Sequence, residues 1–183
     1  SRAAASAAGI MTEPSIEPRP VAPTDDVVIP LPPSAPRVGN AFTRWFGRLL
    51  LRVGGWRMVG EFPDEPKLML IAAPHSSAWD AVWGMAFKLA LGLKIEFMAK
   101  QEAFFWPLGA LLRAFGGFPV NRRAAAGVVD QIADRFRREG SHWVVIAPEG
   151  TRRRVDKWKT GFWRAADAAQ VPVVCVYFHY PER

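Results

Sequence analysis

Apolar and polar positions repeat along the chain with two different periods, and the changes between them predict the secondary structure. In residues 41–53, apolar side chains recur three and four positions apart, which is the spacing of an amphipathic helix. The apolar stripe consists of Phe42, Trp45, Phe46, Leu49, Leu50 and Val53. Another face of the same helix carries three arginines at intervals of four, Arg44, Arg48 and Arg52.

The rest of the chain, up to residue 180, predicts short strands that alternate with helices. Short apolar runs predict strands at 67–73, 95–100, 118–122, 141–150 and 171–180. Helical spacing, with glycine at several ends, predicts helices at 78–93, 105–117, 124–140 and 161–170. This alternation predicts an α/β fold, with a largely parallel or mixed sheet flanked by helices.

Residues 1–40 have a different composition from the rest. They hold eight of the sixteen prolines and show no periodicity, which predicts a disordered or extended Pro-rich tail. Residues 41–183 are then the folded domain. The first ten residues lack the long apolar core of a signal peptide, and Met11 is a candidate natural start.

Charge and cysteine content narrow the classes of partner and compartment. The net charge is +7, and residues 41–183 alone carry +8, which favours a polyanion or an anionic membrane surface. No nucleic-acid-binding motif is present, so nucleic acid is not expected as a partner. The single cysteine, Cys175, excludes an intramolecular disulfide, and its apolar neighbours predict a small core residue. The sequence contains no metal-ligand cluster and no apolar run of about 18 residues.

The stretch "PHSSAWD" (74–80) places His75 and Asp80 five residues apart. On a continuous helix these side chains would lie about 140° apart and would not meet. They can meet if His75 lies in the loop after a strand and Asp80 in the first turn of the next helix. The carboxylate would then fix the imidazole tautomer and raise its basicity. The same stretch matches a capping box of Ser77 and Asp80, in which the carboxylate satisfies only backbone N–H groups. The local sequence leaves both functions open.

Two later stretches also place polar residues directly after predicted strands. "GGFPVNR" ends in Arg122, and "APEGTRRR" contains Glu149, Gly150, Thr151 and Arg152. In a parallel sheet the carboxyl ends of these strands share one edge with His75, which is where ligands of open α/β sheets bind. Arginine holds phosphate oxygens bidentately, and glycine permits close backbone approach. The set predicts a phosphate pocket beside a histidine base.

Four blocks in this order resemble the glycerolipid acyltransferase family, typified by lysophosphatidate acyltransferase. They are H-x-x-x-x-D at His75 and Asp80, a glycine-led block ending in Arg122, P-E-G-T-R at 148–152, and a hydrophobic V-P block at 171–174. The chain departs from the family pattern in its length and at two residues. It ends just after the last predicted strand, where similar proteins usually continue, so the resemblance implies a truncated C-terminus as one explanation. Pro74 stands where many members have asparagine, and Asn121 stands where aspartate is usual.

The resemblance implies an O-acyltransferase of phospholipid biosynthesis that moves a fatty acyl group from acyl-CoA or acyl carrier protein to a lysophospholipid such as 1-acylglycerol-3-phosphate. It implies that His75 is the general base and that Asp80 orients the imidazole. It also implies that the acceptor is bound by Arg122, Glu149, Gly150, Thr151 and Arg152. Neither a metal nor a cofactor is expected, beyond the acyl donor as co-substrate.

Lipid substrates imply contact with a bilayer. The helix at 41–53 has the pattern of an interfacial helix, and the alternative is a helix packed on the sheet. A peripheral protein on the cytoplasmic face of the membrane is therefore expected. Two other functions stay open: an acyltransferase for another lysolipid, such as a lyso-aminolipid, and a non-catalytic peripheral lipid-binding protein.

Overall fold

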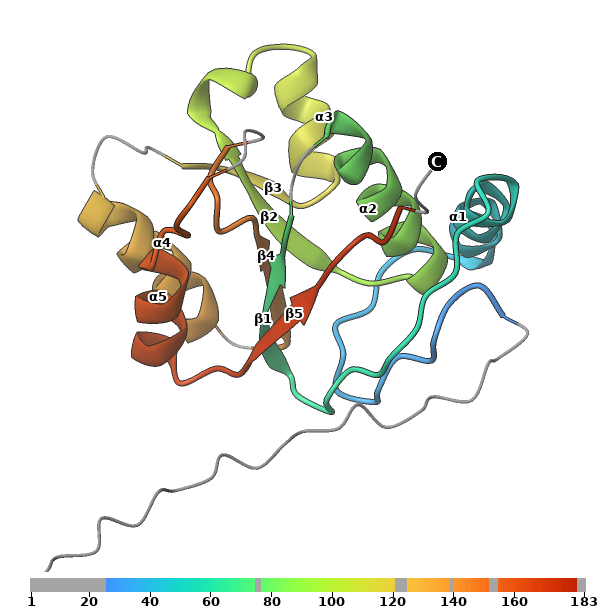
Figure 1. The fold of residues 1–183 in the computed structure, drawn as a ribbon, viewed down its shortest axis with the longest axis horizontal. Helices are drawn as coiled ribbons and strands as arrows, with labels where there is room; N and C mark the ends of the chain where they lie inside the picture. Colours follow the sequence, from blue (N-terminus) through green and yellow to red (C-terminus); the bar gives the residue numbers. More distant parts are fainter. Residues whose placement is uncertain (1–25, 75–76, 121–124, 139, 152–154, 181–183) are drawn as a thin grey trace, which may run out of the picture.

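The computed structural model describes residues 26–74, 77–120, 125–138, 140–151 and 155–180, in which helices and strands alternate (Figure 1). The order is α1 (Ala41–Val53), β1 (Lys67–Ala72), α2 (Ala78–Leu91), β2 (Ile95–Lys100), the 3₁₀ helix η1 (Gln101–Ala103), α3 (Leu108–Ala114), β3 (Gly117–Val120), α4 (Ala125–Arg137), β4 (His142–Ile146), α5 (Gly161–Ala169) and β5 (Val173–Val176).

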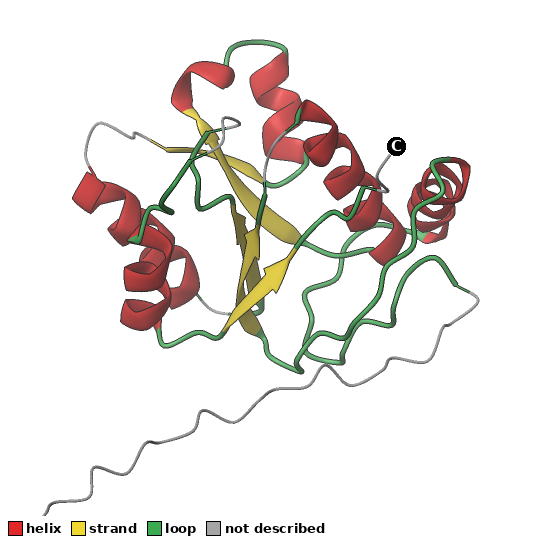
Figure 2. Ribbon diagram, viewed as in Figure 1, coloured by secondary structure: helices red, strands yellow, loops and turns green. Residues whose placement is uncertain are grey.

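The five strands form one sheet in the order β3-β2-β4-β1-β5. Every pairing is parallel, so all the strands end at the same edge. Helices α4 and α5 cover one face of the sheet, while α2 and α3 lie on the other, with α1 outside α2 (Figure 2). The predicted α/β class is confirmed, and of the two predicted kinds of sheet the parallel one is found.

Side chains of the interior strand β1 alternate between two hydrophobic cores. Leu68 and Leu70 point into a core that includes Trp143, whereas Met69 and Ile71 point into the core beneath α4 and α5. Strands buried on both faces read as continuous apolar runs, and "LMLIA" is such a run. The loop after β1 therefore leaves from a rigid, fully covered strand.

Helix α1 forms as predicted but packs on α2 rather than on the sheet. It begins with a capping box between Asn40 and Thr43. Its contact face is narrow: Gly47 and Leu51 are buried, and Gly47 lies against the backbone of Ala86 and Ala90. The whole predicted apolar stripe stays exposed, from 37% at Leu50 to 81% at Val53. In this structure the helix thus turns its aromatic side chains away from the protein.

The predicted boundary of the tail at residue 40 is wrong for residues 26–40. Val28 and Ile29 are buried, and Val28 packs in one cluster with Leu51. Backbone hydrogen bonds tie this segment down as well, since the Val38 N–H donates to the carbonyl of Gly92 (2.8 Å). An extended Pro-containing segment has no helical or strand period, but its spaced apolar side chains still bury on the domain. The predicted tail at 1–25 lies outside the described residues.

Two further predictions are corrected. Helix α3 begins at Leu108 rather than at 105, because Pro107 disfavours helical geometry in the residue before it and lacks an N–H. Cys175 is exposed, not a core residue. Its strand β5 is the edge of the described sheet, so an apolar run there does not imply burial on both faces.

Candidate active site

The capping box at the start of α2 forms, and it folds the Asp80 carboxylate back toward the preceding loop. The Ser77 backbone N–H donates to Oδ2 of Asp80 (2.8 Å), and Oγ of Ser77 accepts from the Trp79 N–H (3.0 Å). Asp80 is only 3% exposed. The predicted capping role is therefore confirmed. The carboxylate is thus turned back toward the Ser77 backbone at the start of the helix.

A tyrosine from the far end of the chain holds the other carboxylate oxygen. The Tyr180 hydroxyl donates to Oδ1 of Asp80 (2.7 Å), and its ring meets Trp56 edge-on at 5.1 Å between centroids. Burial of the hydroxyl, its hydrogen bond to Asp80 and the negative charge of that carboxylate raise the pKa of Tyr180 to about 12. The hydroxyl thus stays protonated as a donor at neutral pH. Sequence reasoning missed this residue, because 100 positions separate it from Asp80.

The segment after β4 forms a tight turn built on Gly150. The Gly150 N–H donates to the carbonyl of Ala147 (3.1 Å), and Gly150 has a φ of +62°, which favours glycine. Glu149 is 7% exposed, whereas Thr151 is exposed. The Lys159 side chain lies beside Gly150, with Nζ 3.3 Å from where a Cβ would stand. Lys159 thus brings a cation to this turn.

The sheet order brings part of the predicted site together. Strand β4 is the direct neighbour of β1, so Asp80 and the turn at 149–151 follow adjacent strands at one edge. Strand β3, which precedes Arg122, is three strand spacings from β1, or about 14 Å. The predicted residues His75, Arg122 and Arg152 lie outside the described residues, so their contacts stay predictions.

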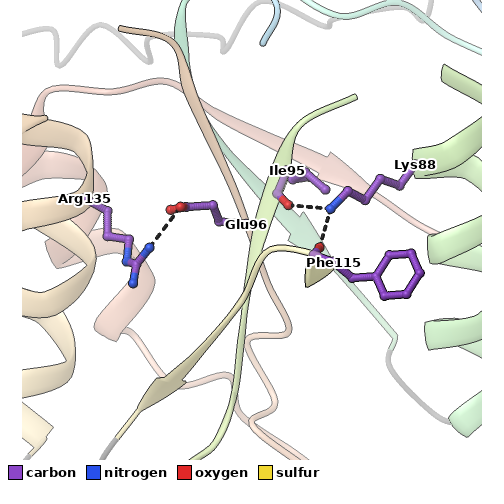
Figure 3. A network of polar contacts seen from close by, with 5 residues as sticks. All are labelled: Lys88, Ile95, Glu96, Phe115 and Arg135. Carbon is purple, nitrogen blue, oxygen red and sulfur yellow. Dashed lines mark hydrogen bonds and ion pairs between the residues drawn. The ribbon is translucent and has the colours of Figure 1, made fainter. Parts of the chain in front are cut away.

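A separate polar network lies at the opposite edge of the sheet. Lys88 is nine-tenths buried, and its Nζ donates to the carbonyls of Ile95 (3.1 Å) and Phe115 (Figure 3). Burial lowers the pKa of Lys88, while the charge of Glu96 opposes that shift. Glu96 itself pairs with Arg135 at 2.9 Å (Figure 3). The Lys88 contacts tie α2 to the amino end of β2 and to the end of α3, and the Glu96 pair ties β2 to α4.

Beside this network lies a cavity of about 350 Å³, lined in part by Lys88, Lys94 and Arg113. Its other walls include the segment that enters α1, the amino end of β2 and the segment that enters β3. It therefore lies away from the carboxyl ends of the strands, where Asp80 and the turn at 149–151 lie. The Lys88 ammonium is held by backbone carbonyls, which indicates a structural role.

Replacing Lys88 with methionine is expected to lower the free energy of unfolding by about 2 kcal/mol, because buried carbonyls lose their donor. The measurement is urea denaturation. Lys94→Met is the matched control: Lys94 lines the same cavity but is exposed, so its effect should stay within about 0.5 kcal/mol. Equal effects of the two substitutions would contradict the structural role of Lys88.

A family model described as Acyltransferase matches residues 60–179. The chain belongs to the acyltransferase family. The match contains all four blocks of the predicted resemblance and confirms it. Asp80 and the turn at 149–151 are thus described members of the acyltransferase blocks.

A solved acyltransferase structure is similar to this chain. The crystal structure of PlsC, the 1-acyl-sn-glycerophosphate (LPA) acyltransferase from Thermotoga maritima, shares 22% sequence identity, with a TM-score of 0.48. The alignment covers 72% of this chain and 54% of that one, so the chain spans little more than half the length of that structure. The sequence matches no curated protein.

No helix among the described residues has both the length and the apolar character needed to cross a membrane. Within the same residues, no group of three His, Cys, Asp or Glu side chains is placed to hold a metal ion.

Proposed function

We propose that this member of the acyltransferase family transfers a fatty acyl group from acyl-CoA or acyl carrier protein to the hydroxyl of a lysophospholipid, such as 1-acylglycerol-3-phosphate, as a step of phospholipid biosynthesis. One observation carries the proposal. A buried carboxylate, Asp80, is fixed at the carboxyl edge of the sheet and turned back toward Ser77, two residues after His75, and the P-E-G-T turn follows the neighbouring strand.

In the proposed mechanism His75 is the general base. Its imidazole takes the proton of the acceptor hydroxyl as that oxygen attacks the thioester carbonyl. The tetrahedral intermediate expels the thiolate, which takes the proton back from the imidazolium, so the products are an ester and a free thiol. Asp80 orients the ring and balances its transient positive charge. General-base catalysis contributes about 10²–10⁴-fold, and positioning of the two substrates adds to it.

The acceptor is proposed to lie across the edge of the sheet from β1 toward β3. Glu149, being buried, suits a hydrogen bond to a glycerol hydroxyl or the orientation of an arginine. Gly150 and Thr151 would line the same wall. Arg122 and Arg152 would hold the phosphate, with Lys159 adding charge beside the turn. Strands β1 and β3, which precede the base and Arg122, are about 14 Å apart, so the acceptor would have to span the ends of β2 and β4.

The direct test is incubation of the purified protein with labelled acyl-CoA, or acyl carrier protein, and a panel of lysolipids, with the product identified by mass. A phosphatidate-type product supports the proposal. Arg122→Ala should slow transfer to phosphate-bearing acceptors much more than to a lyso-aminolipid. If no lysolipid on the panel is acylated, the catalytic proposal fails and lipid binding alone remains.

We further propose that α1 binds the cytoplasmic face of an anionic bilayer and so attaches the protein to the membrane. The exposed apolar side chains of α1 share one face, and Arg44 and Arg52 are exposed on another. Aromatic and leucine side chains beside arginine suit the boundary between headgroups and acyl chains. Each basic residue near an anionic leaflet adds about 1 kcal/mol.

The double substitution Trp45→Ser and Phe46→Ser is expected to weaken binding to vesicles of phosphatidylglycerol and phosphatidylcholine at least tenfold. Burial of an aromatic side chain is worth about 1.5–3 kcal/mol, and about 1.4 kcal/mol corresponds to tenfold. Sedimentation with vesicles measures the loss. Trp163→Ser is the control, because Trp163 is equally exposed on α5, across the sheet. If Trp163→Ser weakens vesicle binding as much as the double substitution does, α1 is not the membrane-binding surface.

A further inference from the structure

The segment after β5 crosses from the edge of the sheet to the start of α2. It places Tyr180 on Asp80, where the hydroxyl donates to Oδ1 (2.7 Å) while the Ser77 N–H donates to Oδ2 (2.8 Å). Each carboxylate oxygen thus has a donor from a different part of the chain.

The ring of Tyr180 is itself held by packing. It meets Trp56 edge-on, and Trp56 also contacts Trp83 and Phe87 of α2 and Phe178. This aromatic cluster joins the chain after α1, helix α2 and the segment after β5. A hydroxyl on an anchored ring is a fixed donor, and a charged acceptor makes its hydrogen bond stronger than a neutral one.

We propose that Tyr180 is a positioning residue that fixes the Asp80 carboxylate against the His75 imidazole. The proposal rests on the proposed function for its role in acyl transfer. Tyr180 acts through Asp80 rather than on the substrate. Because the pKa of Tyr180 is raised to about 12, its hydroxyl stays protonated over the whole pH range in which a histidine base works. The same shift fixes the sign of the stability effect: the contribution is present below pH 10 and is lost as the pH rises through 12.

The test is Tyr180→Phe, which keeps the ring and removes the hydroxyl. Tyr177→Phe is the matched control, because Tyr177 is an exposed tyrosine three positions earlier in the chain. We expect Tyr180→Phe to lower kcat about tenfold with KM within twofold, because the acceptor site is untouched. The pKa of His75, followed by NMR, should move down toward the ordinary value of about 6.5, because the carboxylate no longer holds the imidazolium. Tyr177→Phe should change neither quantity.

Two results would overturn the proposal. One is a Tyr180→Phe protein whose kcat and His75 pKa match those of Tyr177→Phe, even if it melts earlier, since the hydroxyl would then serve only stability. The other is a His75 pKa that rises while kcat is unchanged, since Tyr180 would then only disperse the charge of Asp80. The NMR titration needs no turnover. If the wild-type protein acylates no lysolipid, the proposed function fails while the titration still decides whether Tyr180 positions Asp80.

Discussion

His75→Ala is expected to reduce acyl transfer by at least 10²–10⁴-fold, because no other group would take the proton of the acceptor hydroxyl. The fold should be unchanged, since β1 and α2 are held by core contacts of their own. Initial rates with labelled acyl-CoA measure the loss, and thermal unfolding checks the fold. A variant that keeps a tenth or more of the activity would remove His75 from the mechanism.

Companion substitutions separate catalysis from capping. Asp80→Asn keeps an oxygen for the Ser77 N–H but removes the charge, so it should lower activity severely. Ser77→Ala removes the N-cap hydroxyl and should cost about 1 kcal/mol of stability with little change in rate. If Asp80→Asn and Ser77→Ala both lose only stability, Asp80 is a capping residue and nothing more.

Gly47→Ala is expected to lower the free energy of unfolding by about 2–3 kcal/mol, although alanine favours helices. A Cβ at this position would lie 2.4 Å from the Ala90 nitrogen and 2.9 Å from the Ala86 carbonyl oxygen. These are backbone atoms of α2, so neither side can yield without separating the helices. The intrinsic gain of about 1 kcal/mol for glycine to alanine in a helix does not offset such overpacking. Urea denaturation gives the value.

Gly84→Ala is the matched control for this packing. Gly84 lies on α2, and an added Cβ would meet only the Phe178 ring at 3.7 Å, an ordinary contact. The same substitution there should be neutral or stabilising by up to about 1 kcal/mol. If the two alanine variants unfold alike, α1 does not pack on α2 through Gly47. The exposure of the aromatic stripe would then need another explanation.

The local patterns of the sequence determined most of the secondary structure. Strand β2 and helix α1 have the predicted bounds. A short apolar run predicts the strand, and a long apolar stripe at helical spacing predicts the helix. The capping box at Ser77 and Asp80 was also predictable, since its partners are three residues apart. The start of α3 was missed where Pro107 interrupts an otherwise helical pattern.

Burial and long-range partners could not be predicted in the same way. The stripe of α1 marks an apolar face, but a helix can pack through its narrowest face, here Gly47 and Leu51. Cys175 is exposed because β5 lies at the edge of the sheet. The sequence of one strand does not show its position in the sheet. Residues 26–40 bury apolar side chains without any period, so their composition suggested a tail.

The family could be identified from the sequence alone, because its blocks, the histidine–aspartate spacing among them, are local patterns. Which of these blocks are neighbours in space became known from the fold. It set the P-E-G-T turn beside β1, left two strands between β1 and β3, and joined Tyr180 to Asp80 across 100 residues. The physical reason is that strand order and side-chain contacts depend on the packing of the whole chain, whereas a motif depends only on residues within a few positions.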